Sequence, residues 1–431
     1  MSRDKTAPRP ILPGTARNVL LVLTFVNLFN YIDRFIVPGL AVSLGKSELH
    51  LDRAQIGLLG TGFILVYAIA SPWFGQLGDL RHRPRLIALG VAIWSVATVL
   101  GGFAVSFFTL FVARATLGIG EAAYGSIAPS LLADSFPRRL RGRVFSVFFA
   151  AIPIGSALGY VIAGGMAEHF GWRSAFFVAG APGLVLAVLL LKLPEVPRGA
   201  QEGGDDDIPH YAGPTGGSRL AAYAGLLRNT QYRTTVLGYA AYTFALGALA
   251  FWFPDFLVSF HGMKEARADK LVGLIAVLTG FTGTFVGGWI GDYVLRYTRH
   301  AYLLVSGIAT LIAAPFCVMA LTARKPTFFF AGLIVAELMM FASTGPINSA
   351  IVNYVAPTQR ATAMAFSILL MHLLGDAPSP FLVGAISTAS KAHGMGDGPA
   401  LQHAMLILPA AILLSGVIWT VGGLQKGVRR T

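Results

Sequence analysis

The stretch Gly75-Gln-Leu-Gly78-Asp79-Leu-Arg81-His-Arg83 has a second copy, Gly288-Trp-Ile-Gly291-Asp292-Tyr-Val-Leu-Arg296, in the other half of the chain. Two glycines, the aspartate and the final arginine are in register, and each copy follows the second of six apolar runs in its half. Copies that follow equally numbered runs predict a parallel repeat. We therefore expect two similar bundles of helices.

Long apolar runs alternate with short polar segments along the whole chain. Of the 431 residues, 55% are hydrophobic and only 12% are charged, a composition that a water-soluble surface does not tolerate. A helix needs about 20 apolar residues to cross a bilayer about 30 Å thick. Twelve runs meet this requirement, near 17–44, 54–79, 85–106, 108–133, 143–168, 174–192, 233–258, 270–295, 301–322, 327–355, 361–389 and 401–424. They predict an all-α membrane protein with 12 transmembrane helices in two parallel six-helix pseudo-repeats.

A polar segment separates the two sets of six runs. Residues 194–218 are rich in Gly, Pro and Asp and cannot remain in lipid. Residues 219–228 are basic and amphipathic, which is typical of a helix lying on a membrane surface. The predicted organisation is a tail over 1–16, a bundle over 17–193, a linker over 194–230, a second bundle over 231–424 and a tail over 425–431.

Basic residues are unevenly shared between alternate loops. Segments on the side of the N-terminus, among them 81–85 and 138–143, hold more Arg and Lys than the opposite loops. The positive-inside rule then places both termini in the cytoplasm, with the chain in a plasma membrane, or the inner membrane of a bacterium. This asymmetry explains the net charge of +13 without a nucleic-acid partner, which would need basic residues gathered on one soluble face.

Enzymes and receptors find little support in the sequence. The single cysteine, Cys317, excludes an intramolecular disulfide and a cysteine-based metal site. No His, Asp and Glu cluster has the spacing of metal ligands, and no Ser or His lies in a nucleophile motif. We expect no catalysis, no cofactor and no metal.

Four charged residues fall inside the first and fourth apolar runs: Asp33, Arg34, Arg114 and Glu121. A charge in the middle of a bilayer costs about 2.5–3.5 kcal/mol, so four unpaired charges would cost roughly 10–14 kcal/mol. They must face one another or water. Arg114 and Glu121 are two helical turns apart on one face, whereas the neighbours Asp33 and Arg34 point about 100° apart and need different partners.

A polar stripe accompanies these charges. Asn27, Asn30, Tyr31 and Arg34 have the spacing i, i+3, i+4, i+7, so we expect them to line a cavity. The alternative is that the four charges are structural ion pairs that lock the first helix to the fourth. The second half shows no acid and arginine pair in its equivalent runs, so we expect the charges to serve a function of the first half.

Several motifs resemble the major facilitator superfamily. They are the segment Gly75–Arg83, its copy, and Arg114-Ala-Thr-Leu-Gly-Ile-Gly-Glu-Ala122. Asn30-Tyr-Ile-Asp-Arg-Phe35, the Arg114 segment and His372-Leu-Leu-Gly-Asp-Ala-Pro-Ser-Pro380 also resemble the spinster branch, and the short loops look bacterial. The resemblance implies a transporter of lysophospholipids or sphingosine-1-phosphate-like lipids that is coupled to protons. A transporter of small organic anions or drugs would use the same residues and is the alternative.

The resemblance gives the buried charges a role. Burial favours the protonated form of a carboxyl group and a nearby guanidinium favours the charged form, so the two effects oppose each other. We expect Asp33 and Glu121 to exchange a proton, while Arg114 and Arg34, with Asn30 and Tyr31, hold the anionic head of the substrate. Arginine suits this role because it stays charged and can bind phosphate through two hydrogen bonds. We expect a monomer.

The repeated motif predicts a gate. Asp79 at a helix end can face the positive N-terminus of a helix from the other half, and the run 361–389 is the expected partner. We expect Arg141 and Arg143 to pair with Asp79 or Asp134, and Asp292 with Arg296 to form the mirrored set. The residues of this gate are Gly75, Gly78, Asp79, Arg83, Arg141, Arg143 and Asp292. A structural loop clamp would use the same residues.

Three further ionisable residues lie within apolar runs of the second half. Glu337 falls in the tenth run, and His372 and Asp376 lie one turn apart in the eleventh. They are candidates for a second polar site. Alternatively, Glu337 lies near the end of its helix, and His372 and Asp376 satisfy each other within the helix.

Overall fold

The computed structural model describes residues 13–51, 53–201, 219–263 and 265–425. Residues 1–12 and 426–431 of the predicted tails, and 202–218 of the predicted linker, lie outside the described residues. The chain divides into two compact units. Unit 1 comprises Met1–Thr215 and Val352–Phe366, and unit 2 comprises Gly216–Ile351 and Ser367–Thr431. A short segment from late in the chain therefore packs with the first unit.

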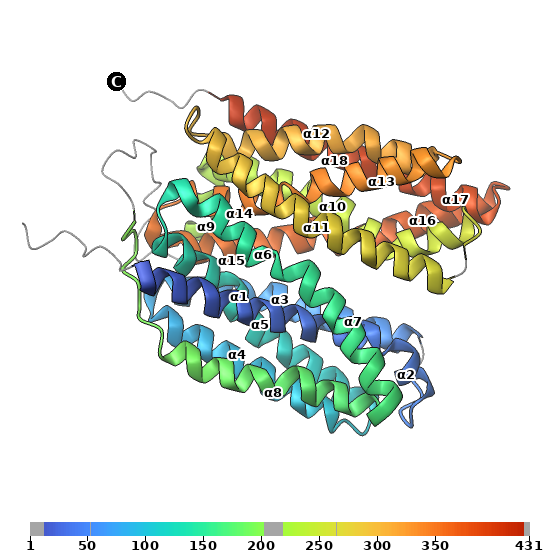
Figure 1. Ribbon diagram of the computed structural model, residues 1–431, viewed down its shortest axis with the longest axis horizontal. Helices are drawn as coiled ribbons and strands as arrows, with labels where there is room; N and C mark the ends of the chain where they lie inside the picture. Colours follow the sequence, from blue (N-terminus) through green and yellow to red (C-terminus); the bar gives the residue numbers. More distant parts are fainter. Residues whose placement is uncertain (1–12, 52, 202–218, 264, 426–431) are drawn as a thin grey trace, which may run out of the picture. The chain divides into compact units, whose positions relative to one another are not determined.

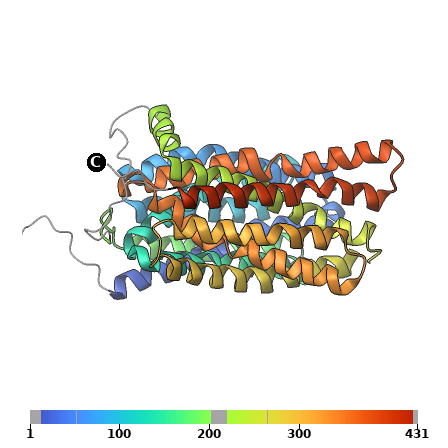
Figure 2. The ribbon, with the colours of Figure 1, turned by 90° about the horizontal axis from the view of Figure 1, so that it is seen from above.

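Unit 1 is built from long helices that run side by side (Figures 1 and 2). In chain order they are α1 (Pro13–Gly39), α2 (Ala41–Lys46), α3 (Arg53–Leu80), α4 (Arg83–Gly102), α5 (Phe107–Ser135), the 3-10 helix η1 (Arg138–Leu140), α6 (Arg141–Phe149), α7 (Ala151–Phe170) and α8 (Trp172–Leu191). The 3-10 helix η2 (Pro357–Gln359) and the start of α15 (Arg360–Met371) belong to the same unit.

Unit 2 is also helical throughout its described spans. Its helices are α9 (Arg219–Arg228), α10 (Thr230–Ser259), α11 (Glu265–Val294), α12 (Ala301–Thr322), α13 (Pro326–Phe341), α14 (Thr344–Asn353) except its last two residues, which belong to unit 1, the rest of α15, the π-helix η3 (His372–Asp376), α16 (Ser379–Ala392), α17 (Asp397–Met405) and α18 (Ile407–Leu424). The segment predicted as a surface helix forms α9, over the predicted residues.

Equivalent helices pack in equivalent ways in the two units. In unit 1, α4 packs against α5 and α8, α3 packs against α5, and α1 packs against α7 and α8. In unit 2, α12 packs against α13 and α18, α11 packs against α13, and α10 packs against η3, α16 and α18. The same order of contacts in both units confirms the parallel repeat.

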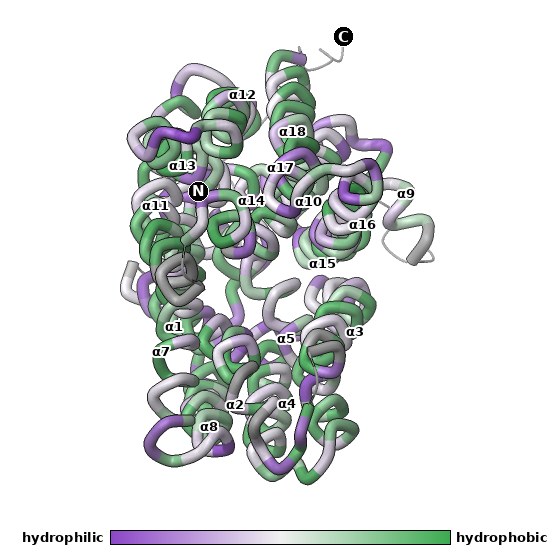
Figure 3. Tube along the Cα trace, turned by 90° about the vertical axis from the view of Figure 1, so that its right-hand side faces the viewer, coloured by the Kyte–Doolittle hydropathy of each residue, from purple (hydrophilic) through white to green (hydrophobic). Residues whose placement is uncertain are grey.

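Eleven of the described helical segments are long and apolar enough to cross a membrane. The remaining predicted run, 108–133, forms α5, which carries Arg114, Glu121 and Asp134. Many large apolar side chains on these helices are exposed, such as Ile69, Val161 and Val185. Apolar colour covers most helical turns, and polar colour gathers in several connections (Figure 3). This pattern fits lipid as the solvent of the helices.

Some predicted runs are interrupted. The run 361–389 divides into α15, η3 and α16, and two prolines, Pro378 and Pro380, follow η3. Proline lacks an amide hydrogen and clashes with the preceding turn, which favours a break at this place. The π-helical turn falls on His372–Asp376, the residues predicted as part of a second polar site.

Candidate functional site

The four charged side chains of α1 and α5 make two ion pairs inside unit 1. Arg34 Nη2 lies 2.6 Å from Glu121 Oε2, and Arg34 Nε lies 3.1 Å from the same oxygen. Arg114 Nη1 lies 3.4 Å from Asp33 Oδ1 and 3.4 Å from the Asp33 carbonyl oxygen. Each pair joins α1 to α5. The neighbours Asp33 and Arg34 therefore take different partners, as their directions on the helix require.

The two pairs differ in burial. The Arg114 and Asp33 side chains are 4% and 1% exposed. Glu121 is completely buried, but the Arg34 side chain is 21% exposed. The weaker contact is thus the deeper one, and Arg34 is the charged group of this cluster that a molecule from outside can reach.

Aromatic rings surround the Arg34 guanidinium. Its central carbon lies 5.0 Å from the ring centres of Tyr31, Phe63 and Tyr67. Phe63 also lies 5.3 Å from the guanidinium of Arg114. A cation over a ring face gains about 0.5–2 kcal/mol. Phe63 and Tyr67 were not among the predicted site residues, and their spacing of four residues on α3 was the available signal.

A hydroxyl group completes the surroundings of Asp33. Thr98 Oγ1 on α4 lies within hydrogen-bond distance of Asp33 Oδ2 and 2.9 Å from the carbonyl oxygen of Trp94. A threonine in a helix commonly donates to the carbonyl oxygen four residues earlier. The sequence therefore carried no signal for the contact of Thr98 with Asp33. The Asp33 carboxylate is thus held by α4 and α5 together.

Three polar atoms of this cluster are buried without a hydrogen-bond partner among the described residues. They are Glu121 Oε1, Asn30 Nδ2 and Arg114 Nε. An unsatisfied buried polar group costs about 1–3 kcal/mol. The site therefore has capacity for a proton, a water molecule or a ligand atom. Asn27 is engaged, because its Nδ2 lies 2.9 Å from the carbonyl oxygen of Phe148.

Local sequence fixes the position of α5. Ser106 and Thr109 form a capping box at its start, in which each side chain accepts a hydrogen bond from the backbone amide of the other residue. A methyl group at Gly118 would lie 2.8 Å from the carbonyl oxygen of Phe63. Because Gly118 has none, α5 approaches the α3 backbone closely and holds Arg114 and Glu121 beside Phe63 and Tyr67.

The repeated motif lies against the start of α15. Asp79 Oδ1 accepts a hydrogen bond from the amide of Ala361 at 3.0 Å, and Oδ2 accepts one from Thr362 at 2.8 Å. These amides belong to the first turn of α15, where no helical carbonyl can accept from them. A methyl group at Gly75 would lie 2.4 Å from the Ala365 side chain, so the glycine permits this approach. A methyl group at Gly78 would lie 2.6 Å from Ile127.

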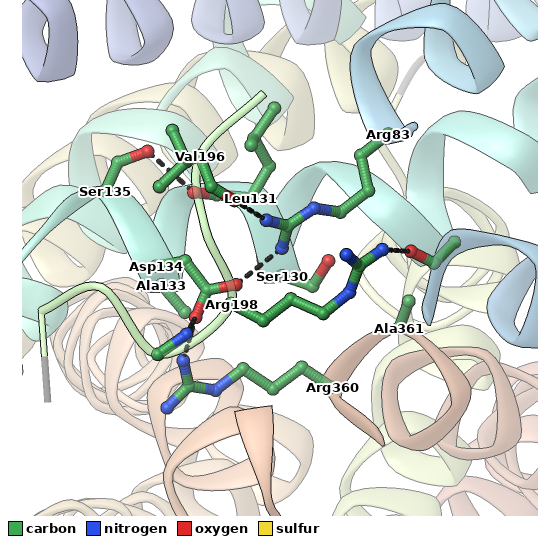
Figure 4. A network of polar contacts seen from close by, with 12 residues as sticks. Arg83, Ser130, Leu131, Ala133, Asp134, Ser135, Val196, Arg198, Arg360 and Ala361 are labelled. Atoms are coloured by element: carbon green, nitrogen blue, oxygen red, sulfur yellow. Dashed lines mark hydrogen bonds and ion pairs between the residues drawn. The ribbon is translucent and has the colours of Figure 1, made fainter. Parts of the chain in front are cut away.

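Asp134 is the centre of a second polar network (Figure 4). Arg83 Nη1 lies 2.5 Å from Asp134 Oδ2, and Arg360 forms an ion pair with Asp134 Oδ1. Arg83 also reaches Glu195, with its Nε 2.7 Å from Oε1. The amide of Gly199 donates to Asp134 Oδ1 at 3.0 Å. A carboxylate in the first half thus ties the start of α15 to unit 1.

Arg141, from the first half of the sequence, contacts a residue from the second half, as Arg360 from the second half contacts Asp134 in the first. Arg141 Nη1 is hydrogen-bonded to Asn353 Oδ1, and its Nε donates to the carbonyl oxygen of Ala133 at 2.9 Å. Arg360 Nε likewise donates to Val352, eight residues before it, at 3.0 Å. Arg141, predicted as a gate residue, thus contacts Asn353 from late in the chain. Arg143 is partly buried on α6.

The remaining predicted residues lie in unit 2. Asp292 accepts a hydrogen bond from the Tyr302 hydroxyl at 2.8 Å, and the Arg296 guanidinium lies 5.5 Å from the ring of Tyr293. In unit 1 the equivalent Asp79 accepts hydrogen bonds from the amides of Ala361 and Thr362.

The predicted second polar site divides into two places. Glu337 Oε2 accepts a hydrogen bond from Thr279 Oγ1 at 2.8 Å, near the middle of the span Pro326–Asn353. His372 Nδ1 lies 2.9 and 3.0 Å from the carboxylate oxygens of Asp376. His372 and Asp376 therefore bind each other within η3.

The chain is similar to known proteins over most of its length. Residues 23–380 match the family model described as Major Facilitator Superfamily. The chain is 34% identical over 407 residues to the protein spinster of Drosophila melanogaster, covering 90% of this chain and 65% of that protein. It is 31% identical over 419 residues to the sphingosine-1-phosphate transporter SPNS2 of Xenopus tropicalis, covering 92% and 80%.

A solved structure shares the fold. It is the crystal structure of a bacterial homolog to the human lysosomal transporter spinster in an inward-facing and unoccupied conformation. The match has a TM-score of 0.59, a sequence identity of 24% and a coverage of 96% of both chains.

Proposed function

Because the chain belongs to the spinster branch of the major facilitator superfamily, a family of membrane transporters, we propose that it carries an anionic amphiphile and couples this transport to protons. The cargo is a lysophospholipid or a sphingosine-phosphate-like lipid. The observation that carries the proposal is the Arg34 and Glu121 pair, in which a partly exposed guanidinium faces a buried carboxylate.

Competition for Arg34 supplies the coupling. In the described pair, Glu121 Oε2 occupies the Nε and Nη2 edge of the guanidinium. Protonation of Glu121 weakens this charge-assisted contact, which is worth about 1.5–3 kcal/mol. The freed edge of Arg34 then binds a phosphate or carboxylate of the cargo. Proton binding and anion binding therefore favour each other.

Asp33 and Arg114 take supporting roles. Arg114 is almost fully buried and lies beside Asp33, so we assign it to holding Asp33 rather than to contacting cargo. Asp33 is the second proton-exchanging group, since a change in its charge alters the partner of Arg114. Asn30 and Tyr31 share the helix face of Arg34 and contribute to the cargo site.

The class of cargo follows from the surroundings of Arg34. The rings of Tyr31, Phe63 and Tyr67 offer apolar faces beside a cation, which suits a molecule with a charged head and an apolar chain. The relative SPNS2 is named for sphingosine-1-phosphate. A small organic anion or drug would use the same arginine and is the second candidate.

Alternating access is proposed to use the contacts of α15. The gate comprises Gly75, Gly78, Asp79, Arg83, Arg141 and Arg143, and Asp292 takes the corresponding place in unit 2. Glu337 and, separately, the His372 and Asp376 pair provide further polar groups. We propose that the chain acts as a monomer in a plasma membrane, the inner membrane if bacterial, with both termini in the cytoplasm.

Reconstitution in liposomes tests the proposal. Uptake of lysolipids and phosphorylated sphingoid bases is followed with and without an imposed pH gradient, beside a sugar acid as a hydrophilic anion. The proposal expects gradient-driven uptake of the long-chain anions only. Uptake of the sugar acid alone would favour the second candidate, and lipid uptake that ignores the gradient would exclude proton coupling.

A further inference from the structure

A groove in unit 2 lies far along the chain from the α1 and α5 charges. Its volume is about 700 Å³, and its walls come from the end of α10, from α16 and from the start of α17. Helices α10 and α16 end at Ser259 and Ala392, and α17 begins at Asp397. The groove therefore lies beside the ends of three long apolar helical segments, where we expect the boundary of membrane and water.

Apolar side chains make up part of the lining of the groove. Trp252 Nε1 donates to the carbonyl oxygen of Pro380 at 2.9 Å, which fixes the indole across α10 and α16. A methyl group at Gly384 would lie 3.1 Å from the indole ring, so this glycine leaves the ring close to the α16 backbone. Phe381, which also lines the groove, is 76% exposed. An acyl chain would find aromatic surface here.

The groove also carries charges of both signs. Asp255 is exposed and makes no ion pair among the described residues. Lys391 forms an ion pair with Asp397, and their side chains are 49% and 67% exposed. Exposed ion pairs contribute little free energy, so the ammonium of Lys391 is available to another anion. The groove thus offers one cation and an excess of carboxylate.

We propose that this groove binds a zwitterionic phospholipid of the surrounding bilayer. The phosphate of the lipid lies at Lys391, and its ammonium group lies between the Asp255 carboxylate and the face of Trp252. A carboxylate beside an indole is a suitable pair for an organic cation. The acyl chains run along Phe381 and Pro380 toward the hydrocarbon. Interfacial Trp and Lys side chains are typical of such a boundary.

Quenching of Trp252 fluorescence tests the proposal in nanodiscs that contain no cargo and no pH gradient, so the result does not depend on transport. Discs contain phosphatidylethanolamine and phosphatidylglycerol in equal amounts, with bromine on the chains of one or the other. The signal lost in Trp252→Phe identifies the contribution of Trp252. We expect brominated phosphatidylethanolamine to quench this contribution about threefold more efficiently than brominated phosphatidylglycerol, the scale of one exposed ion pair.

One variant tests the role of the Asp255 charge, and a second is its control. Asp255→Asn is expected to abolish the preference, and the matched surface change Glu168→Gln, on α7 in unit 1, to leave it intact. Equal quenching by the two lipids in the parent protein would overturn the proposal, as would a preference for phosphatidylglycerol. A preference that survives Asp255→Asn would also overturn it.

Discussion

Arg34 is held by two kinds of interaction of different strength. The contact with Glu121 is a charge-assisted hydrogen bond of about 1.5–3 kcal/mol, and each ring face adds about 0.5–2 kcal/mol. Three rings surround the guanidinium. Loss of the Glu121 charge therefore weakens one partner of Arg34 and leaves the side chain in place. This property suits a residue that exchanges an internal carboxylate for an external anion.

Replacing Glu121 by glutamine tests the proton role. Gln resembles the protonated carboxyl group in shape and cannot exchange a proton. We expect uptake driven by a pH gradient to fall at least tenfold, the factor that corresponds to about 1.4 kcal/mol, while exchange without a gradient stays within about threefold of the parent. Tracer uptake and counterflow in liposomes measure the two rates.

Glu168→Gln is the control, because Glu168 is an exposed carboxylate outside the cluster. Asp33→Asn should behave like Glu121→Gln. If both cluster variants keep the pH dependence of the parent, these carboxylates do not couple transport to protons.

Replacing Arg34 by lysine tests the anion site. Lysine keeps the positive charge but loses the planar fork that binds phosphate through two hydrogen bonds. We expect the dissociation constant for a lysolipid phosphate to rise about tenfold, in line with the loss of one charged hydrogen bond. The binding isotherm of the purified protein measures this change. Arg233→Lys, at an exposed position on α10, should bind as the parent does, and equal affinity of Arg34→Lys would remove Arg34 from the site.

At the scale of elements, the contact of α3 with α15 combines a charge with close packing. Asp79 accepts hydrogen bonds from two amides in the first turn of α15, where the helix dipole is positive. Gly75 allows this approach because any larger side chain would collide with Ala365. The glycine and the aspartate of the motif therefore act on the same contact.

Removing the carboxylate should loosen this contact. Asp79→Ala leaves two amides of α15 without an acceptor, at about 1–3 kcal/mol each if they stay buried. We expect the distance between spin labels at Arg81 and Thr358, both exposed, to shift to longer values in pulsed dipolar spectra. Asp79→Asn keeps one acceptor and should shift the distribution less. Identical distributions in the parent and Asp79→Ala would show that Asp79 does not hold α15.

At the scale of the molecule, two arginines cross between the halves of the sequence. Arg360 from the second half binds Asp134, and Arg141 from the first half binds Asn353. Each arginine also bonds the carbonyl eight residues before it. The arrangement is reciprocal, but one partner is an acid and the other an amide. The Nδ2 atom of Asn353 is buried without a hydrogen-bond partner among the described residues.

Giving Arg141 an acidic partner, as Arg360 already has, should strengthen the contact of Arg141 with residue 353. Asn353→Asp removes the unpartnered amide nitrogen and places a carboxylate opposite Arg141. A buried charged hydrogen bond is worth about 1.5–3 kcal/mol, so we expect transport in liposomes to slow about tenfold. The double variant with Arg141→Gln should return toward the parent rate, giving a coupling energy by a double-mutant cycle. If Asn353→Asp transports as fast as the parent, the contact of Arg141 with residue 353 does not limit turnover.

Much of the architecture follows from the sequence alone. The twelve apolar runs, the repeat of Gly75–Arg83 and the four charges in lipid-length segments were all visible without coordinates. They are visible because a membrane imposes a length and an apolar composition on each helix, and because an unpaired charge in lipid is costly. The face of each charge followed from helical periodicity.

Only the tertiary structure decided the partners. Periodicity gives the direction of Arg34 about its own helix axis but not the depth of Glu121 on another helix, so Arg34 with Glu121 and Asp33 with Arg114 were one choice among several. Thr98, Phe63 and Tyr67 are common residues of apolar helices and acquire a role only when α3 and α4 bring them to the charges. Arg360 and Asn353 lie more than 200 residues from Asp134 and Arg141, and packing of distant segments, which no local pattern records, joins them.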